Sequence, residues 1–309
     1  MPLHPQAQAI CDAANAVERP ALADENLQLQ REAFGGLMLL AGEPEPVYSV
    51  EDRDAEGIPV RIYRPSPDDG LSVVVYLHGG GWTIGSVDQY DPVMRQVANA
   101  ANVIVVAPEY RLAPEHPFPA PLDDCWHALC WTAKNASAFG GDSARLAVMG
   151  DSAGGNLSAV CALQARDSGG PDLALQVLVY PVTDCDLSTP SYCENRDGYL
   201  LTENEMRWFF DCYTRGDIDR TDWRISPLRA GDVAGVAPAF VLTAEFDPLR
   251  DEGEAYARRL AEAGVPVQQH RYDGMVHAFF GLSAAFDASR DAIDRAATAL
   301  RRAFGTLDG

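Results

Sequence analysis

Six apolar runs of strand length recur along the chain, and most of them are separated by helical patterns. The first five runs are almost continuously apolar, which is typical of strands whose sheet is covered by helices on both faces. Strands that alternate with helices in this way predict an α/β fold with a mostly parallel, doubly wound sheet. The runs lie at 72–78, 102–108, 145–150, 175–181, 238–245 and 265–272, with helices expected at 122–138, 153–166, 251–263 and 287–304.

Other segments depart from this alternation. Residues 47–53 and 58–65 alternate apolar and polar side chains around Gly57, which predicts a β-hairpin. Residues 1–42 have apolar side chains at helical spacing up to about Leu40 and are expected to be helical.

The interval 185–237 contains no clear strand, although 202–216 has a helical pattern. We therefore predict a discontinuous helical cap, formed by residues 1–42 and 185–225 and packed over one end of the sheet. The main α/β domain would then consist of residues 43–184 and 226–309.

The charge and cysteine content narrow the classes of partner. The chain has 24 Lys and Arg against 45 Asp and Glu, a net charge of −21. Nucleic acids and anionic membranes bind basic patches, so neither is expected as a partner. The sequence shows no apolar run near the roughly 20 residues of a membrane span and no signal-like N-terminus, which favours a cytoplasmic protein. Seven cysteines without a C-x-x-C pair argue against a disulfide framework or a zinc site.

Ser152 lies in the sequence Gly-Asp-Ser-Ala-Gly at 150–154, between an apolar run and a helical pattern. G-x-S-x-G at a strand-to-helix turn is the pattern of a nucleophile elbow. Such a sharp turn is strained, and Gly150 and Gly154 would remove the clashes that larger residues would make. The turn also places the serine at a helix N-terminus, where backbone amides favour negative charge. The alternative is a glycine-rich turn without chemistry.

The second motif, His-Gly-Gly-Gly-Trp at 78–82, closes the run at 72–78. Glycines leave backbone N–H groups open to close approach by a ligand. Where a sheet carries a nucleophile elbow, this loop supplies oxyanion-hole donors beside the amide that follows the nucleophile. A phosphate-binding loop is disfavoured because no G-K-[ST] sequence is present and the charge is acidic.

A nucleophilic serine requires a base and an acid that orients the base. Of the six histidines, His277 follows the last predicted strand, where ligands and catalytic groups gather in open α/β sheets. The acid should lie between the serine and the histidine in the chain. Asp247 satisfies this at the end of the run at 238–245, with Glu245 as a competitor. Asp251 and Glu252 fall in the first turn of the next predicted helix, which explains them without catalysis.

Five motifs in this order resemble the hormone-sensitive-lipase-like esterases of the α/β-hydrolase superfamily. They are HGGGW, YRLAPEHPFPA at 110–120, GDSAGGNL, DPLRDEG and H-A-F, and the resemblance spans roughly residues 45–305. It implies an α/β-hydrolase fold, an N-terminal helical cap and a cofactor-free carboxylic ester hydrolase that acts on short- to medium-chain acyl esters. It also allows a homodimer.

By the same resemblance, the triad roles fall on Ser152, Asp247 and His277. The oxyanion donors fall on the amides of Gly79, Gly80 and Ala153. Many members of the family have His-Gly-Phe where this chain has an alanine, Ala278, after the histidine. A shift in the loop backbone or the pocket shape is expected there.

Several aromatic residues near these motifs are candidates to line a substrate pocket, although ordinary core packing would explain each of them as well. They are Trp82, Tyr110, Phe209, Phe210 and Phe279. Two other functions stay open: hydrolysis of amides or peptides by the same triad, and a non-catalytic ligand receptor. Matched ester and anilide substrates would distinguish an amidase from an esterase. Labelling of Ser152 by an organophosphate would distinguish an enzyme from a non-catalytic receptor.

Overall fold

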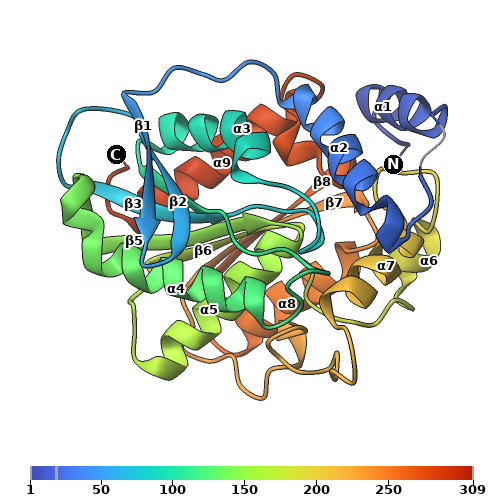
Figure 1. The fold of residues 1–309 in the computed structure, drawn as a ribbon. Helices are drawn as coiled ribbons and strands as arrows, with labels where there is room; N and C mark the ends of the chain where they lie inside the picture. The colour runs from blue at the N-terminus through green and yellow to red at the C-terminus, as the bar shows by residue number, and fades with distance from the viewer. Residues whose placement is uncertain (1, 18–19, 308–309) are drawn as a thin grey trace.

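The computed structural model describes residues 2–17 and 20–307, and within them the centre of the fold is an eight-stranded sheet (Figure 1). Its strand order is β1-β2-β4-β3-β5-β6-β7-β8. β1 (Ser49–Ala55) and β2 (Ile58–Arg64) form the predicted hairpin around Gly57, and β2 runs antiparallel to β4 (Ile104–Pro108). The pairs from β4 onward are parallel, which confirms the mostly parallel α/β sheet.

Each of the six apolar runs forms a strand. The remaining strands are β3 (Leu71–Leu77), β5 (Gly141–Asp151), β6 (Leu175–Val179), β7 (Ala239–Phe246) and β8 (Val267–Val276). β5 and β8 are longer than predicted, because backbone pairing continues past the apolar part of each strand. Leu71 pairs with Gly141, and Phe246 pairs with Val276 after an irregularity in the register.

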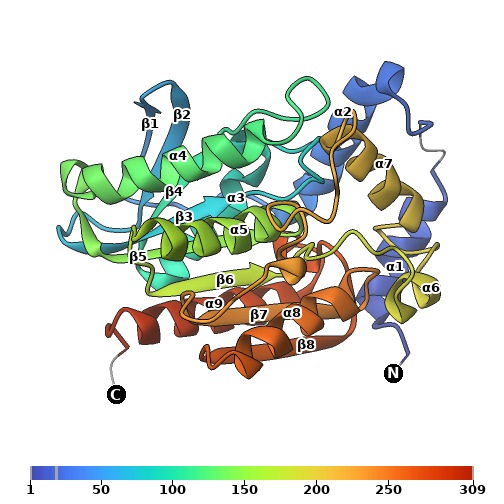
Figure 2. The same cartoon turned by 90° about the horizontal axis from the view of Figure 1, so that it is seen from below.

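Helices cover both faces of the sheet, as predicted. α3 (Val87–Ala101) and α9 (Asp287–Ala303) lie on one face. α4 (Ala120–Asn135), α5 (Ala153–Ser168) and α8 (Arg250–Glu262) lie on the other (Figure 2). Successive side chains of a strand point to opposite faces, so each central strand contributes to two cores.

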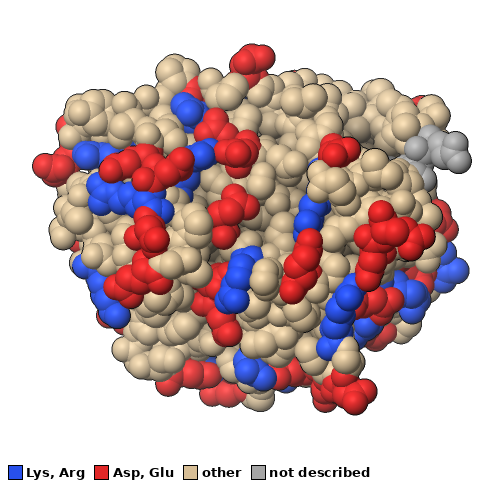
Figure 3. Space-filling model, in the orientation of Figure 1, with Lys and Arg blue, Asp and Glu red and all other residues tan. Residues whose placement is uncertain are grey.

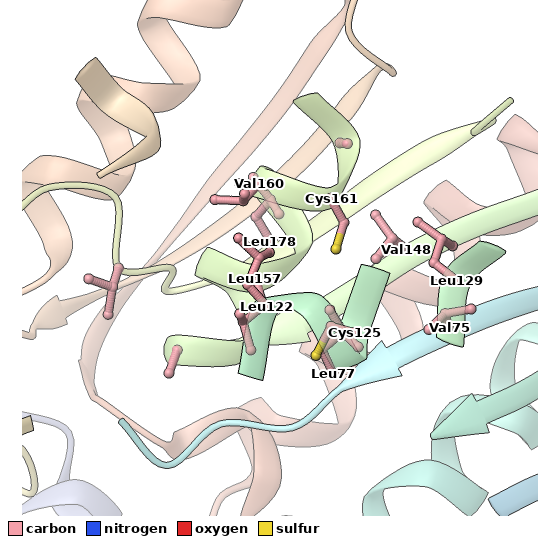
Figure 4. Close-up of a cluster of buried hydrophobic side chains, with 14 of the residues drawn as sticks. Val75, Leu77, Leu122, Cys125, Leu129, Val148, Leu157, Val160, Cys161 and Leu178 are labelled. Atoms are coloured by element: carbon pink, nitrogen blue, oxygen red, sulfur yellow. The ribbon is translucent and has the colours of Figure 1, made fainter. Parts of the chain in front are cut away.

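Figure 4 shows part of the core on the α4 and α5 side, where Val75 of β3 lies near Leu129 of α4 and Leu77 of β3 near Cys125. Cys125 and Cys161 belong to the same cluster, and burial raises the pKa of both thiols. All seven cysteines are free thiols in the structure. These two therefore act as small neutral core residues.

The segments predicted to form a cap lie together at one end of the sheet, on the right of Figures 1 and 2. Their helices are α1 (Pro5–Asn15), α2 (Leu27–Met38), α6 (Pro190–Glu194) and α7 (Glu203–Tyr213). The N-terminal segment is helical as expected, with two helices, and it ends at Gly42 with φ +83°. Short 3₁₀ turns occur at Asp24–Asn26, Leu39–Ala41, Ala136–Phe139, Pro227–Arg229 and Phe279–Gly281.

The surface mixes acidic side chains with arginines (Figure 3). Arg61, for example, lies 2.6 Å from both Asp52 and Asp88. Such exposed pairs each contribute little to stability. Among the described helices, none is both long and apolar enough to span a membrane.

Candidate active site

Ser152 occupies the sharp turn between β5 and α5. Its φ is +57° and its ψ −120°, a backbone conformation that is rare for a residue with a side chain. The backbone is held by the end of β6 and the loop that follows it: Ser152 N–H donates to Val179 O (2.9 Å), and Ser152 O accepts from Val182 N–H (3.2 Å). These contacts keep the serine in its strained conformation.

Steric clashes explain why glycines occupy positions 150 and 154, on either side of Ser152. A Cβ atom on Gly154 would lie 1.9 Å from the carbonyl oxygen of Leu77, at the end of β3. A Cβ atom on Gly150 would lie 2.4 Å from the backbone of Gly154. Real Cβ atoms essentially never come within 3.0 Å of another heavy atom. The start of α5 can therefore pack this closely against β3 only because both residues lack side chains.

Ser152, His277 and Asp247 form one hydrogen-bonded chain at the carboxyl ends of β5, β8 and β7. His277 Nε2 lies 3.0 Å from Ser152 Oγ, and His277 Nδ1 lies 2.7 Å from Asp247 Oδ2. Asp247 is fully buried, and its Oδ1 accepts from Leu249 N–H at 2.9 Å. With Nδ1 facing the carboxylate, the imidazole proton belongs on Nδ1, which leaves Nε2 free to accept the serine proton.

The competing acidic residues bind elsewhere. Glu245 Oε2 accepts from the amide of Gly274 at 2.7 Å. Asp251 Oδ2 accepts from the amide of Ser191 at 2.8 Å, and Glu252 Oε1 from that of Thr183 at 2.7 Å. Among these carboxylates, Asp247 is the one in contact with His277.

His78 anchors the glycine loop. Its buried ring has a pKa lowered to about 4 by burial, so the imidazole is neutral at ordinary pH. His78 Nδ1 lies 2.7 Å from the carbonyl oxygen of Gly79. It donates a hydrogen bond to that oxygen when the neutral imidazole carries its proton on Nδ1. Tyr110 stacks on the ring at 4.3 Å and donates its hydroxyl to His78 O at 2.7 Å. Tyr110 is therefore part of the loop's support.

Asp151, which the sequence analysis did not select, connects the nucleophile turn to this loop. Asp151 Oδ1 accepts from Tyr76 Oη and from the amide of Gly79, both at 3.1 Å. Asp151 Oδ2 accepts from Tyr90 Oη at 2.9 Å. Burial raises the pKa of Asp151 to about 6, although these three donors oppose the shift. The sequence did carry a signal for this role: Asp151 is a charged residue inside the G-x-S-x-G motif, directly after an apolar run that predicts a buried strand.

The amide of Gly79, predicted as an oxyanion donor, is thus already bonded to Asp151. The other two predicted donors, Gly80 and Ala153, have amides that meet no acceptor in the described parts of the chain. The amide of Gly81 is likewise without an acceptor there.

A cavity of about 370 Å³ lies over Ser152 and His277. Apart from these two, its walls are mainly apolar and come largely from the predicted cap: Ala14, Val17, Pro20, Gln30, Ala33, Phe34, Leu37, Ile84, Leu200, Leu201, Glu205, Phe209 and Ala278. The described residues include no group of three or more His, Cys, Asp or Glu that could hold a metal ion.

Five aromatic residues were expected at a pocket. Among the described residues that line the cavity, Phe209 is the one of these five. Its ring covers Gly81, where an added Cβ would lie 2.2 Å from the ring. Trp82 is instead fully buried in a stack with Tyr213 at 4.3 Å. Phe210 packs against Trp82, Phe279 packs against Tyr180, and Tyr110 supports His78 as described above. The contacts of these four are those of core packing.

Ala278 lies in the left-handed region, with φ +68°. An alanine is strained there and a glycine is not. This gives a physical reason for the glycine that many members of the resembling family have after the histidine.

Comparison with known proteins agrees with this geometry. The sequence model of a family described as "alpha/beta hydrolase fold" matches residues 74–281. Carboxylesterase NlhH of Mycobacterium tuberculosis is 49% identical over 251 residues, which cover 80% of this chain and 78% of that protein. An ethyl acetate hydrolase of Pseudomonas putida is 39% identical over 288 residues, covering 91% of this chain and 90% of that protein.

Solved structures extend the match over nearly the whole chain. An α/β hydrolase from the metagenome of Lake Arreo superposes with a TM-score of 0.93 at 41% identity, covering 98% of this chain and 99% of that one. An esterase of Pyrobaculum calidifontis gives a TM-score of 0.90 at 38% identity, with coverages of 97% and 99%. The chain therefore belongs to the α/β-hydrolase superfamily, within its hormone-sensitive-lipase-like esterases.

Proposed function

We propose that Ser152, His277 and Asp247 hydrolyse short- to medium-chain carboxylic esters through an acyl-enzyme. The broader class, carboxylesterase, is supported by the named relatives. The observation that carries the proposal is the hydrogen-bonded chain from Asp247 through His277 to Ser152 Oγ, at 2.7 and 3.0 Å. These distances are within the reach that proton transfer between a nucleophile and its base requires.

In the first half of the reaction, His277 Nε2 takes the Ser152 proton while Oγ forms a bond to the ester carbonyl carbon. Asp247 holds Nδ1–H and stabilises the imidazolium that results. The tetrahedral intermediate then expels the alcohol, which leaves with the proton from Nε2. In the second half a water molecule repeats these steps on the acyl-enzyme and releases the carboxylic acid.

The oxyanion of each tetrahedral intermediate needs amide donors that have no other acceptor. Gly80 and Ala153 fit that requirement, and Gly81 fits it better than Gly79, whose N–H is occupied by Asp151. We therefore assign the oxyanion hole to Gly80, Gly81 and Ala153. One such donor typically contributes about 3 kcal/mol to transition-state stabilisation.

The cavity supports a preference for small, uncharged acyl groups. Its volume of about 370 Å³ lies at the small end of the range for ligand sites. The name of the Pseudomonas putida relative, an ethyl acetate hydrolase, also favours short esters. Because most of the wall comes from residues 14–37 and 200–209, this assignment also supports the proposed cap at 1–42 and 185–225.

The test is a series of p-nitrophenyl esters with increasing acyl length, assayed on the wild type and on Ser152→Ala. We expect kcat/KM to peak at short to medium chains and turnover to be lost in Ser152→Ala, with the circular dichroism spectrum unchanged. Turnover by Ser152→Ala at the wild-type rate would refute the proposal. A matched anilide series serves as a control for the reaction class, and anilides cleaved as fast as esters would favour an amidase.

A further inference from the structure

Tyr180 follows β6 directly and has an unusual backbone conformation. Its φ is +34°, which is rare for a bulky residue, and its side chain is 1% exposed. The amide of Tyr180 donates to Leu242 O in β7 at 2.6 Å. On either side, Val179 and Val182 hold the backbone of Ser152. Strain of this kind persists only where the surroundings enforce it, and it is concentrated at functional sites.

The strained conformation places the tyrosine ring beside the histidine of the triad. The centroids of the Tyr180 and His277 rings lie 4.5 Å apart, with 52° between their planes. Phe279 also contacts the Tyr180 ring, edge-on at a centroid distance of 5.9 Å, and Tyr272 packs against Phe279 at 4.8 Å. A cation within about 6 Å of an aromatic ring is attracted by the electron-rich face. His277 becomes such a cation each time it takes a proton from Ser152 or from water.

We propose that Tyr180 is a positioning residue of the triad, whose ring fixes the His277 imidazole and stabilises its cationic form during each proton transfer. This inference rests on the proposed esterase mechanism. It assigns to the ring a contribution separate from that of Asp247, which contacts the imidazole edge at Nδ1.

Other ionisable groups also face His277, and the test must separate them. Asp247 bonds to Nδ1, Ser152 to Nε2, and the charge of Asp151 acts on the imidazole from the end of β5. Glu205 of α7 lines the same cavity. Burial raises the pKa of Tyr180 well above its usual value, so its hydroxyl stays neutral over the working pH range. The ring rather than the hydroxyl is therefore the group under test.

Two variants separate the ring from the hydroxyl. Tyr180→Phe keeps the ring, and Tyr180→Leu removes it. Tyr256→Leu is a matched control, since Tyr256 is fully buried in α8 and takes no part in the site. Each preparation is first titrated with a p-nitrophenyl phosphonate to count competent active sites. Values of kcat, KM and the pH profile of kcat/KM are then measured per titrated site.

For Tyr180→Phe we expect kcat within about twofold of the wild type and an unchanged profile. For Tyr180→Leu we expect kcat to fall roughly tenfold, KM to stay within about twofold, and the acid midpoint of kcat/KM to move about 0.5–1 pH unit lower. The midpoint moves down because the cation becomes harder to form. Tyr256→Leu should lower Tm without moving the midpoint.

If Tyr180→Leu does not fold, pentafluorophenylalanine at position 180 keeps the ring shape and reverses the charge of its face. It should reproduce the loss of kcat and the shift of the midpoint. Wild-type kcat and midpoint in the fluorinated or leucine protein would overturn the inference. A shift shared by Tyr180→Phe would overturn it too, because the effect would then come from the hydroxyl. Activity in Ser152→Ala would instead refute the esterase mechanism itself.

Discussion

Gly154→Ala offers a direct test of how closely the nucleophile turn is packed. The added Cβ would lie 1.9 Å from Leu77 O and 2.6 Å from His78 O, whereas ordinary contacts begin at 3.4 Å. Helix α5 and the end of β3 would therefore have to separate by the difference between 3.4 and 1.9 Å, which is 1.5 Å. Both neighbours are backbone atoms, so no side chain can rotate away.

Overpacking typically destabilises a protein by about 1–3 kcal/mol, and we expect the upper end, about 3 kcal/mol, where the neighbours are backbone atoms. In a chain of this size, we expect Tm to fall by roughly 6–12 °C. Leu77 and His78 lead directly into the glycine loop, and a displacement of about 1 Å can cost about 100-fold in rate. We therefore expect kcat per titrated active site to fall at least about 100-fold.

The assay combines thermal unfolding with p-nitrophenyl acetate kinetics, normalised by phosphonate titration. Gly36→Ala is the matched control, because Gly36 is an exposed residue inside α2 and its added Cβ would meet nothing within 4 Å. That variant should be neutral or gain about 0.5–1 kcal/mol. Wild-type Tm and kcat in Gly154→Ala would show that the turn is not as tightly packed as these distances require.

Two further predictions concern the neighbours of the triad. Ala278→Gly relieves a left-handed alanine at φ +68°, so urea unfolding should show a gain of about 0.5–1 kcal/mol, and a loss of stability would contradict that reasoning. Asp151→Asn removes a carboxyl that keeps its proton up to about pH 6 in the folded protein and releases it near pH 3.8 when unfolded. The stability that this group contributes therefore falls as pH rises from about 4 to 6, and the variant should gain about 3 kcal/mol relative to the wild type over that interval. Parallel stability curves for the two proteins would exclude the raised pKa.

The sequence predicted the features that depend on local pattern. Almost continuous apolar runs identified five of the sheet strands after the hairpin, and a shorter apolar start at 265–272 identified the sixth. The G-x-S-x-G turn was found between a strand and a helix. The order of Ser152, Asp247 and His277 along the chain was enough to nominate residues that the fold brings within hydrogen-bonding distance.

What the sequence could not predict depends on contacts between distant elements. The hydroxyls that bind Asp151 belong to Tyr76 and Tyr90, which are 75 and 61 residues away in the chain. Phe209 and Phe210 are adjacent and chemically identical, yet one lines the cavity and the other packs on Trp82. That difference arises from the direction in which each side chain leaves α7, which is set by tertiary packing.

The assignment of an oxyanion donor to Gly81 rather than Gly79 also depends on contacts that the sequence does not reveal, here at single peptide groups. In a trans peptide the carbonyl and the following N–H point in opposite directions. His78 Nδ1 holds the carbonyl of Gly79, so it also directs the N–H of Gly80, while Asp151 holds the N–H of Gly79. At neutral pH the two anchors are a neutral imidazole and a carboxylate, because their pKa values are about 4 and about 6. On acidification Asp151 takes up a proton first, which weakens its bond to the Gly79 amide while the His78 anchor is intact. Loss of activity at acidic pH should therefore include a contribution from the titration of Asp151, which Asp151→Asn removes.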